Sequence, residues 1–523
     1  QAAGVTVLGQ SGAPGAGAKV RIRGAGSNGN SDPIYVVDGM RTSNIDFLDS
    51  NDIEKLEILK DAASAAIYGA DGGNGVVMIT TKKGKSGSMK ISYSNQFGFQ
   101  YLRSKLEMMN ADQYVHWIDE TKPAGNRPNV ADWQGKQGTN WIDETAEEGA
   151  PMQHHTLQLA GGNDVSTFLL SGNFFTQDGI FGGDKTNFKR TTVRFNSNHK
   201  VSKYLEVGEN FSLSVNKRKA FTEDDSFNGI MNHAMLMDPL TPVFYPNGTV
   251  LPQHVQDAVT GGKAVPTNAN GEYYGLSNYI VGEIANPIGQ IALDHGLTQE
   301  TKIIGNVYAN IKPFEGFVFT TRYGIEQTYT NYNDWTQKYW WNTNKENTTN
   351  NKTYNQNIFK TWLFENFATY SKTINKHEFS VMAGMSAQDS EKSYLDSRTA
   401  GMIKEGDIWA TVGEIPVDGT IAGNRTPTSM ESYFGRITYS FDNKYLFQAS
   451  LRNDNSSLFA PDKRAGYFPA VSAGWVISNE SFWKLEAVNY VKLRASWGEN
   501  GSTSNISPGQ WQALITKDGL KYP

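Results

Sequence analysis

The 523-residue sequence contains no cysteine and no long hydrophobic run. Without cysteine, these residues can form no disulfide bridge, thiolate metal site or cysteine nucleophile. No apolar stretch approaches the ~18 residues that a transmembrane helix requires. The 48 Lys and Arg against 53 Asp and Glu give a net charge of only −5. So small an imbalance argues against a nucleic-acid partner.

Glycine and aromatic residues are abundant instead, with 52 Gly, 24 Tyr, 26 Phe and 12 Trp. Long segments after Gly84 alternate apolar and polar residues. Residues 445–452 place Tyr, Phe, Ala and Leu on one face, and Gln, Ser and Arg share the other with one Leu; 433–441 and 317–326 repeat this pattern. Such alternation is typical of an outer-membrane barrel with a hydrated lumen. A soluble β-sandwich also buries one apolar face, so the alternation alone leaves both possibilities open.

The connections between these segments differ in length at the two ends. Short, charged turns are expected at 200–204, 312–316, 372–377 and 441–444. Long loops are expected near 219–297, 333–355 and 394–428. Short turns on one side and long loops on the other favour the membrane barrel, with the long loops outside the cell.

Residues 1–84 carry a different series of short elements. Strands are expected at 20–24, 33–39, 53–59 and 76–79. A helix from Ala62 to Tyr68 would begin after Asp61 and end at Gly69. The alternation around Leu56 predicts a half-buried strand. This order predicts a compact α/β domain, and an ordinary soluble α/β domain is the alternative.

The ordered series resembles the plug domain of TonB-dependent outer-membrane transporters, in the form carried by the SusC/RagA family. Two positions depart from the family pattern, which usually has Arg in place of Asp71 and often Pro in place of Arg41. The resemblance rests on motifs that contain Arg21, Arg23, Asp38, Gly39, Glu54, Glu57, Lys60, Asp61, Tyr68, Gly69, Asn74 and Gly75.

The resemblance implies a transmembrane antiparallel β-barrel with an N-terminal α/β plug. About thirteen strand candidates follow residue 85, of the roughly 22 in such transporters. We therefore expect a plug (1–84) that is incomplete at its N-terminus and a barrel (85–523) that is incomplete at its C-terminus. The strands from Met89 onward should form an unclosed wall, with the last strand near 490–500 and the plug inside its curve.

The family further implies TonB-dependent import of an oligosaccharide or peptide across the outer membrane of a Gram-negative, Bacteroidetes-like bacterium. The implied partners are a SusD-like surface lipoprotein and TonB, which would bind a segment absent from this chain. The alternative function is a passive porin or a surface-adhesion barrel. A folded plug argues against a porin, because it would block a diffusion pore.

Two sets of side chains are candidates for function. The contacts between plug and wall should be polar and wet, without a dry apolar core, and the charged plug residues are the candidates for these contacts. Acidic residues of the lumen could meet Arg21 and Arg23. In the external loops, aromatic side chains could bind substrate or a partner, and packing within the loops is an equally good interpretation of them. This second set is Trp335, Tyr339, Trp340 and Trp341.

The sequence predicts no enzyme activity, cofactor or metal. Residues 24–29 match GxGxxG, but another strand follows directly where a dinucleotide site needs a helix. The pairs His154–His155 and His377–Glu378 lack zinc-ligand spacing, and we expect exposed or turn histidines there. We find no nucleophile with a matching base.

Overall fold

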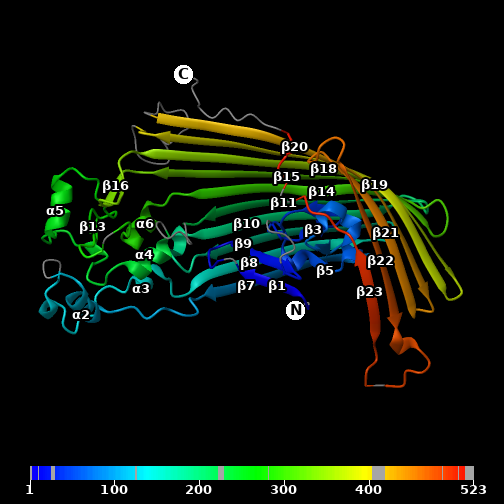
Figure 1. Cartoon of the computed structure of the whole chain (residues 1–523), viewed down its shortest axis with the longest axis horizontal. Coiled ribbons are helices and arrows are strands. Elements are labelled where there is room, and N and C mark those ends of the chain that lie inside the picture. The colour runs from blue at the N-terminus through cyan, green and yellow to red at the C-terminus, as the bar shows by residue number, and fades with distance from the viewer. Residues whose placement is uncertain are drawn as a thin grey trace.

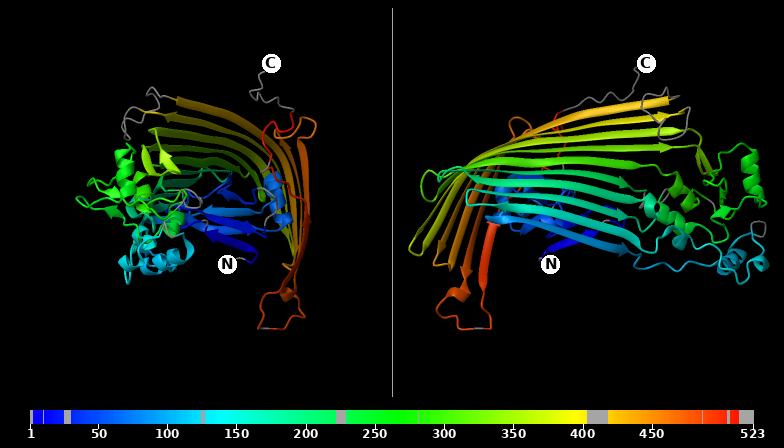
Figure 2. Two further views of the ribbon diagram at one scale, coloured as in Figure 1. Left: turned by 60° about the vertical axis from the view of Figure 1, so that its left-hand side comes forward. Right: turned by 180° about the vertical axis from the view of Figure 1, so that it is seen from behind.

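The computed structural model shows a long, curved antiparallel sheet with a small α/β domain on its concave side (Figures 1 and 2). We call the large sheet the wall and the elements β1 to β6 the plug. None of the helices in the part of the chain that the structure describes is long and apolar enough to cross a membrane. The structure describes residues 3–9, 11–24, 30–123, 127–221, 229–280, 282–402, 418–485, 487–503 and 506–512.

The wall contains thirteen strands that follow one another in chain order, each antiparallel to its neighbours. The edge strands β7 and β23 do not pair with each other within the described residues, so the expected unclosed meander is confirmed. The strands are β7 (Gly87–Gln100), β8 (Ala150–Gly162), β9 (Ser166–Asp178), β10 (Asn187–Lys200), β11 (Leu205–Lys219), β14 (Leu297–Ile311), β15 (Phe317–Thr336), β18 (Asn351–Ile374), β19 (His377–Ala400), β20 (Asp418–Phe441), β21 (Tyr445–Ser456), β22 (Ala465–Val476) and β23 (Lys492–Gly498).

The two faces of the wall differ in chemistry. On the convex face, Tyr433 is 49% exposed and Leu451 is 53% exposed. On the concave face, Ser432 and Arg452 are buried against the plug or against neighbouring side chains. This is the apolar-outside, polar-inside alternation expected of a barrel around a hydrated lumen.

The connections show the predicted asymmetry. Tight turns with positive φ at Asn375, Asp442 and Asn443 join strands at one end, as hairpin geometry requires. The loop after β11 holds α4 (Ile230–Leu236), β12 (Phe244–Tyr245), α5 (Gln253–Thr260), β13 (Tyr273–Tyr274) and α6 (Pro287–Leu293). A second long loop, between β7 and β8, was not predicted; it holds α2 (Ala111–Thr121), η4 (Val130–Asp132) and α3 (Trp141–Thr145). Both loops lie at the end opposite the tight turns (Figure 1).

Two predicted loops are shorter than expected. The loop near 333–355 shrinks because β15 and β18 pair as far as Thr336 and Asn351, leaving the hairpin β16 (Tyr339–Asn342) and β17 (Lys345–Asn347). The loop near 394–428 shrinks because β19 and β20 pair from Ala400 and Asp418 onward; residues 403–417 lie outside the described residues. Strands pair through their backbones and need no apolar face. The pairing can therefore continue where both faces of the sheet are hydrated, although the sequence there shows no alternation of apolar and polar residues.

The plug contains two small sheets. The strands β1 (Val5–Gly9) and β2 (Ala18–Ile22) form one hairpin. The next two residues, Arg23 and Gly24, have positive φ angles. The second sheet has the order β4-β3-β6-β5. Its strands are β3 (Ile34–Val37), β4 (Met40–Thr42), β5 (Ile53–Leu59) and β6 (Val76–Thr81).

The plug differs from the sequence-based prediction in its helix and in the exposure of Leu56, and it contains one further turn. The predicted helix is split into α1 (Ala62–Ala65) and η2 (Ala66–Asp71), with Gly69 at φ 56° and ψ −122°. Leu56 is 49% exposed, because β5 is an edge strand that no described residue covers on that face. A further turn, η1 (Ser50–Asp52), precedes β5. Residues 25–29 of the glycine-rich turn lie outside the described residues.

Candidate functional site

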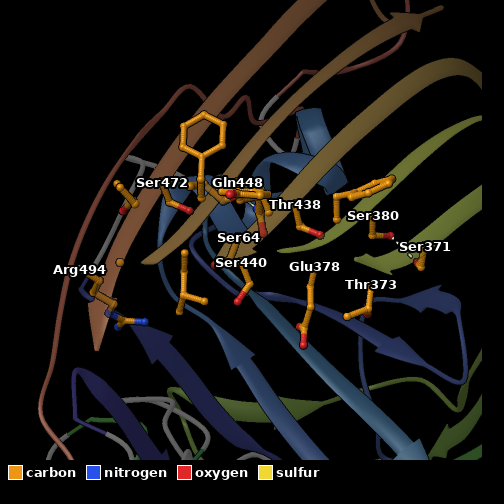
Figure 3. Close-up of a pocket in the computed structure, with 18 of the residues that line it drawn as sticks. Ser64, Ser371, Thr373, Glu378, Ser380, Thr438, Ser440, Gln448, Ser472 and Arg494 are labelled. Carbon is orange, nitrogen blue, oxygen red and sulfur yellow. Dashed lines mark hydrogen bonds between the residues drawn. The ribbon is translucent and has the colours of Figure 1, made fainter. Parts of the chain in front are cut away.

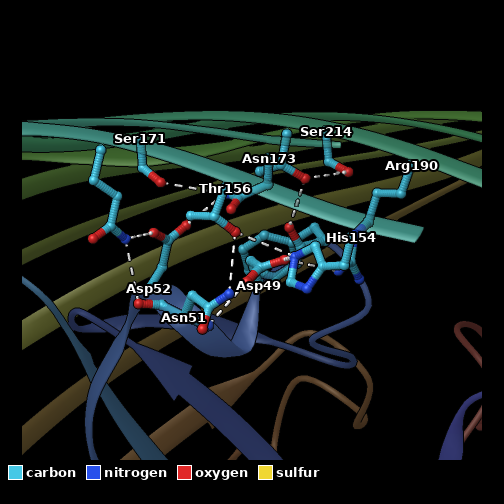
Figure 4. A network of polar contacts seen from close by, with 12 residues as sticks. Asp49, Asn51, Asp52, His154, Thr156, Ser171, Asn173, Arg190 and Ser214 are labelled. Carbon is cyan, nitrogen blue, oxygen red and sulfur yellow. Dashed lines mark hydrogen bonds and ion pairs between the residues drawn. The ribbon is translucent and has the colours of Figure 1, made fainter. Parts of the chain in front are cut away.

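One side of the plug is fastened to the wall through η1 (Figure 4). The Asp49 side chain is fully buried and caps η1 by accepting a hydrogen bond from the Asn51 amide. Its Oδ2 lies 2.6 Å from His154 Nε2 on β8 and 3.3 Å from Arg190 Nη2 on β10. The loop that carries Asp49 is therefore held by two wall strands at once.

The last two residues of η1, Asn51 and Asp52, extend the same network (Figure 4). Asn51 Nδ2 donates to Thr156 Oγ1 at 3.1 Å. Asp52 accepts from Gln158 Nε2 at 2.9 Å and from Asn173 Nδ2 at 3.0 Å. Hydrogen bonds to an ionised carboxylate are the stronger kind, and here they join the plug to β8 and β9.

Two buried ion pairs continue this contact along β10, β14 and β15. Arg194 Nη2 lies 2.9 Å from Asp38 Oδ2, and Thr81 also donates its amide to Asp38. Lys302 Nζ lies 2.8 Å from Glu326 Oε1 and donates to Thr42 Oγ1 of β4 at 2.9 Å. Removing one partner of such a pair leaves a buried charge, at a cost of roughly 3–5 kcal/mol. We call the contacts of Asp38, Asp49, Asn51 and Asp52 with the wall the anchor.

The contact between plug and wall is not polar throughout. Ile304 of β14 and Leu363 of β18 belong to the hydrophobic core of the plug, in one cluster with Met40 and Phe47. The expectation of purely polar contacts is therefore wrong at this point. Both side chains face the lumen, where the plug excludes water from them.

The opposite side of the plug meets the wall through α1 and η2. Ala70 donates its amide to Asp454 Oδ2 at 2.7 Å, and Arg452 Nη1 donates to the Ile67 carbonyl at 2.9 Å. Arg452 and Asp454 also pair with each other at 2.6 Å. A Cβ at Gly69 would come within 2.0 Å of Asp454 Oδ2. The positive φ and this close approach together require glycine at position 69.

The two departures from the family pattern contact each other. Arg41 Nη1 lies 3.1 Å from Asp71 Oδ2, and the Arg41 side chain is almost fully buried. Burial lowers the pKa of Arg41 and the Asp71 carboxylate raises it, with a net upward shift. Tyr68 lies beneath the guanidinium, which is 5.8 Å from the ring centroid. The pair ties the β3–β4 hairpin to the end of η2.

A polar cavity of about 540 Å³ lies between this pair and the wall. Asp32, Asn74 and Ser43 line it from the plug, and hydroxyl and amide side chains of β18 to β20 line it from the wall. Of its cations, Arg41 and Lys302 are paired with carboxylates, and Lys392 of β19 also lines it. The cavity therefore offers mainly hydrogen-bonding groups.

The two arginines expected to meet acids of the lumen instead contact acids of the plug. Arg21 Nη1 lies 3.0 Å from Asp32, and Arg23 Nη2 lies 2.5 Å from Asp61. Both arginines find these partners inside the plug, because Asp32 and Asp61 lie within reach of the end of β2. Asp61 does reach the wall, where it lies 3.4 Å from Arg494.

The other predicted plug residues are spread over the domain. Glu54 and Glu57 are exposed on β5. Lys60 donates to the Ala3 carbonyl at 2.8 Å. Asn74 donates to the carbonyls of Asn30 and Asp32. Gly39 and Gly75 have positive φ where Arg322 and Ile22 occupy the space of a Cβ.

The aromatic loop residues do not form one surface. Trp341 is 3% exposed and belongs to a core inside the loops with Val255 and Tyr274, against which Tyr339 and Trp340 pack. Trp335 stacks on His295, with ring centroids 3.9 Å apart. Packing within the loops therefore accounts for Trp341.

Sequence reasoning missed the wall half of the anchor. His154 was expected to be exposed, but it faces the lumen and contacts Asp49. The signal was present, because His154, Thr156 and Gln158 alternate along β8 and share its inner face. His377 does lie at a turn, next to Tyr439. Among the described residues, no group of three or more His, Asp or Glu could hold a metal ion.

Comparison with known proteins agrees with this geometry. Residues 1–76 match the TonB-dependent Receptor Plug Domain. The TonB-dependent receptor SusC of Bacteroides thetaiotaomicron is 27% identical over 95% of this chain and 49% of its own length. The TonB-dependent receptor P26 of Formosa agariphila is 26% identical over 99% of this chain and 50% of its own length. The chain thus spans about half the length of the curated relatives it matches.

Solved structures share the fold. The RagAB peptide transporter superposes with a TM-score of 0.81 at 24% identity, covering 100% of this chain and 60% of that one. The ferric citrate transporter FecA superposes with a TM-score of 0.55 at 10% identity, covering 95% of this chain and 59% of that one.

A plug held inside an antiparallel wall with an apolar outer face defines the class of TonB-dependent receptors. Within that class, the chain is similar to the SusC/RagA family over nearly its whole length. The wall is part of the family's β-barrel.

Proposed function

We propose that this chain is the plug and part of the barrel of an outer-membrane importer energised through TonB, in a Gram-negative, Bacteroidetes-like bacterium. The observation that carries the proposal is the buried anchor of Asp38, Asp49 and Asp52 on the lumen side of the wall. It fixes a folded domain across the path that a passive porin would leave open. We keep Gly84 as the boundary between plug and barrel.

The substrate that best suits the site is a polar oligomer, either an oligosaccharide or a peptide. The cavity beside Arg41 and Asp71 is lined mainly by hydroxyl and amide groups, and its charged groups are largely paired. Such a lining matches ligands that form many neutral hydrogen bonds. The long loops at the outer end would receive a SusD-like lipoprotein as partner.

The alternative is a surface-adhesion barrel, which would use the same loops without transport. Uptake of labelled oligosaccharides and peptides by cells that carry the full-length receptor separates the two functions. We expect uptake that requires both TonB and the SusD-like lipoprotein encoded beside the receptor. Uptake that persists without TonB, or surface binding with no uptake at all, would contradict import energised by TonB.

A further inference from the structure

On the convex face of the wall, a row of polar side chains crosses the neighbouring strands β8, β9, β10, β11 and β14 near the long loops (Figure 1). The face is set by β10, where Arg190, Thr192 and Arg194 contact the plug. Their alternate neighbours therefore point away from the plug. We call the row the polar row, and strand register aligns its members: Gln153, Thr176, Lys189, Lys217 and Gln299.

Two lysines stand directly opposite each other at the centre of the polar row. Lys189 and Lys217 are both exposed, and neither forms an ion pair with another described residue. Like charges at opposed positions of neighbouring strands destabilise a sheet. One row closer to the loops, Asp178 and Lys219 lie on the same face, so this patch holds three lysines and one carboxylate. An anion from outside the chain would offset the repulsion.

On the side of the tight turns, the same face becomes apolar. Val193 and Phe195 of β10 and Phe211 of β11 are exposed there, and the aligned pair Ser197 and Glu209 ends this apolar stretch. From Glu209 to Lys217 the strand measures roughly 27 Å at ~3.4 Å per residue. At a tilt of ~40° this is about 21 Å across a membrane, close to the ~25 Å apolar band of outer-membrane barrels. The lysines therefore lie at the level of the lipid headgroups.

Aromatic rings mark the same level toward the β7 edge of the wall. Phe97 continues the polar row beyond Gln153. In the next row toward the tight turns, His155 contacts the rings of Phe97 and Phe174. Outer-membrane barrels carry aromatic girdles where the apolar band meets water. The rings thus place the polar row at the boundary of the membrane independently of the strand length.

Charges of both signs are mixed at the opposite end of the wall. Lys376 lies 3.0 Å from Asp442 in a tight turn. In the cavity of about 1020 Å³ at that end, Arg494 lies 3.4 Å from Asp61, and Glu378 also lines the cavity (Figure 3). The pair of opposed lysines is therefore not the pattern of every charged group near the ends of the strands.

We propose that the polar row binds the headgroup of a phosphorylated glycolipid in the outer leaflet of the membrane. Opposed side chains start about 5 Å apart, so both ammonium groups reach one phosphate. The amide and hydroxyl groups beside them hydrogen-bond sugar hydroxyls, and the acyl chains lie on Val193 and Phe195. A second copy of this chain fits less well, because a twofold axis through the row would bring four lysines together.

This inference rests on the proposed orientation, with the long loops outside, and adds a lipid partner to the import function. It does not depend on which substrate is imported. The lipid is recognised through its phosphate, its sugar and its acyl chains, each by a different part of the same face.

Binding of a purified glycolipid by the full-length receptor in detergent tests the proposal. The probe is an acylated disaccharide that carries two phosphates, compared with the same molecule after its phosphates are removed. The test variant is Lys189→Gln with Lys217→Gln. The matched control is Lys200→Gln with Lys203→Gln, which removes two exposed lysines at the other end of the same two strands. Bound glycolipid per receptor is counted by native mass spectrometry, which also reports the oligomeric state.

We expect the Lys189→Gln, Lys217→Gln variant to bind the phosphorylated glycolipid at least about fivefold more weakly than the parent receptor. The control should stay within twofold, and the dephosphorylated form should bind all three receptors equally. Equal affinity of the test variant and the parent, or the same loss in the control, overturns the proposal. A dimer that the test substitutions disrupt, at unchanged glycolipid affinity, would assign the face to a second copy and also overturn it.

Two further measurements cover a test variant that fails to assemble. Lys189→Arg with Lys217→Arg keeps both charges and should bind within twofold of the parent. In the parent receptor, the preference for the phosphorylated form should shrink at least fivefold from low salt to ~0.5 M salt, because salt screens exposed ion pairs. No preference at low salt overturns the proposal. None of these assays measures uptake, so a failure of the import function leaves their result readable.

Discussion

At the scale of single residues, the pair Arg41–Asp71 shows that two departures from the family pattern form one structural unit. Arg41 alone would be a buried arginine without a partner. Asp71 alone would be an unexplained loss of the arginine that the family usually has at this position. Their 3.1 Å contact explains both. The sequence shows each departure but not their proximity, since thirty residues and the whole of β5 separate them.

We expect Arg41→Ala and Asp71→Ala to loosen the plug, and the exchange Arg41→Asp with Asp71→Arg to restore part of the loss. Residues in direct contact couple by about 0.5–3 kcal/mol in a double-mutant cycle. The measurement is protease resistance of the plug in the purified full-length receptor. Additive losses, with no recovery in the exchanged variant, would show that the pair is not a unit.

At the scale of elements, the strands and tight turns follow from the sequence, but the extensions of β15, β19 and β20 do not. Alternation predicts a strand only where one face meets lipid or a core, as in residues 433–441. Beyond the membrane both faces are hydrated, so residues 394–400 look like a loop in the sequence and yet pair. The wall half of the anchor was missed because alternation places His154, Thr156 and Gln158 on one face of β8 but does not identify their partners in the plug.

One of these extensions carries a pH-dependent contact. Asp334 lies at the long-loop end of β15, beyond the alternating residues 317–326 that we assign to the membrane. Burial and then the charge of Asp294 raise the pKa of Asp334 to about 6. Burial also raises the pKa of Asp294. Tyr332 and Lys352 lie close enough to act on Asp334.

An unfolded aspartate has a pKa of ~3.9. Because the pKa of Asp334 is higher in the folded chain, the folded end of β15 is more stable when Asp334 is protonated. Its extra stability is fully present below about pH 4 and is lost as the pH rises through about 6. Hydrogen exchange of residues 332–336, corrected for intrinsic rates, should show up to about tenfold less protection at pH 7.5 than at pH 4.5, after allowance for solvent screening. Asp294→Asn should flatten this dependence; greater protection at pH 7.5 in the parent chain would contradict the assignment.

At the scale of the whole molecule, plug, wall and asymmetry of loops all follow from the sequence through alternation, turn lengths and the ordered motifs of residues 20–83. What does not follow is how the plug sits in the wall. Asp38 was a predicted plug residue, but only the fold brings Arg194 to it. Arg21 and Arg23 bind acids of the plug, because strand alternation assigns a face and not a partner.

We propose that the wall spans the outer membrane with its long loops outside and its tight turns inside. Two valines make a matched pair for testing it: Val250 in the loop after β11 is 90% exposed, and Val201 in the turn between β10 and β11 is 62% exposed. Each is replaced by cysteine in the full-length receptor, and intact cells are treated with a membrane-impermeant maleimide. We expect labelling of Val250→Cys in intact cells and of Val201→Cys only after the outer membrane is disrupted. Labelling of both in intact cells, or of Val201→Cys alone, would contradict it.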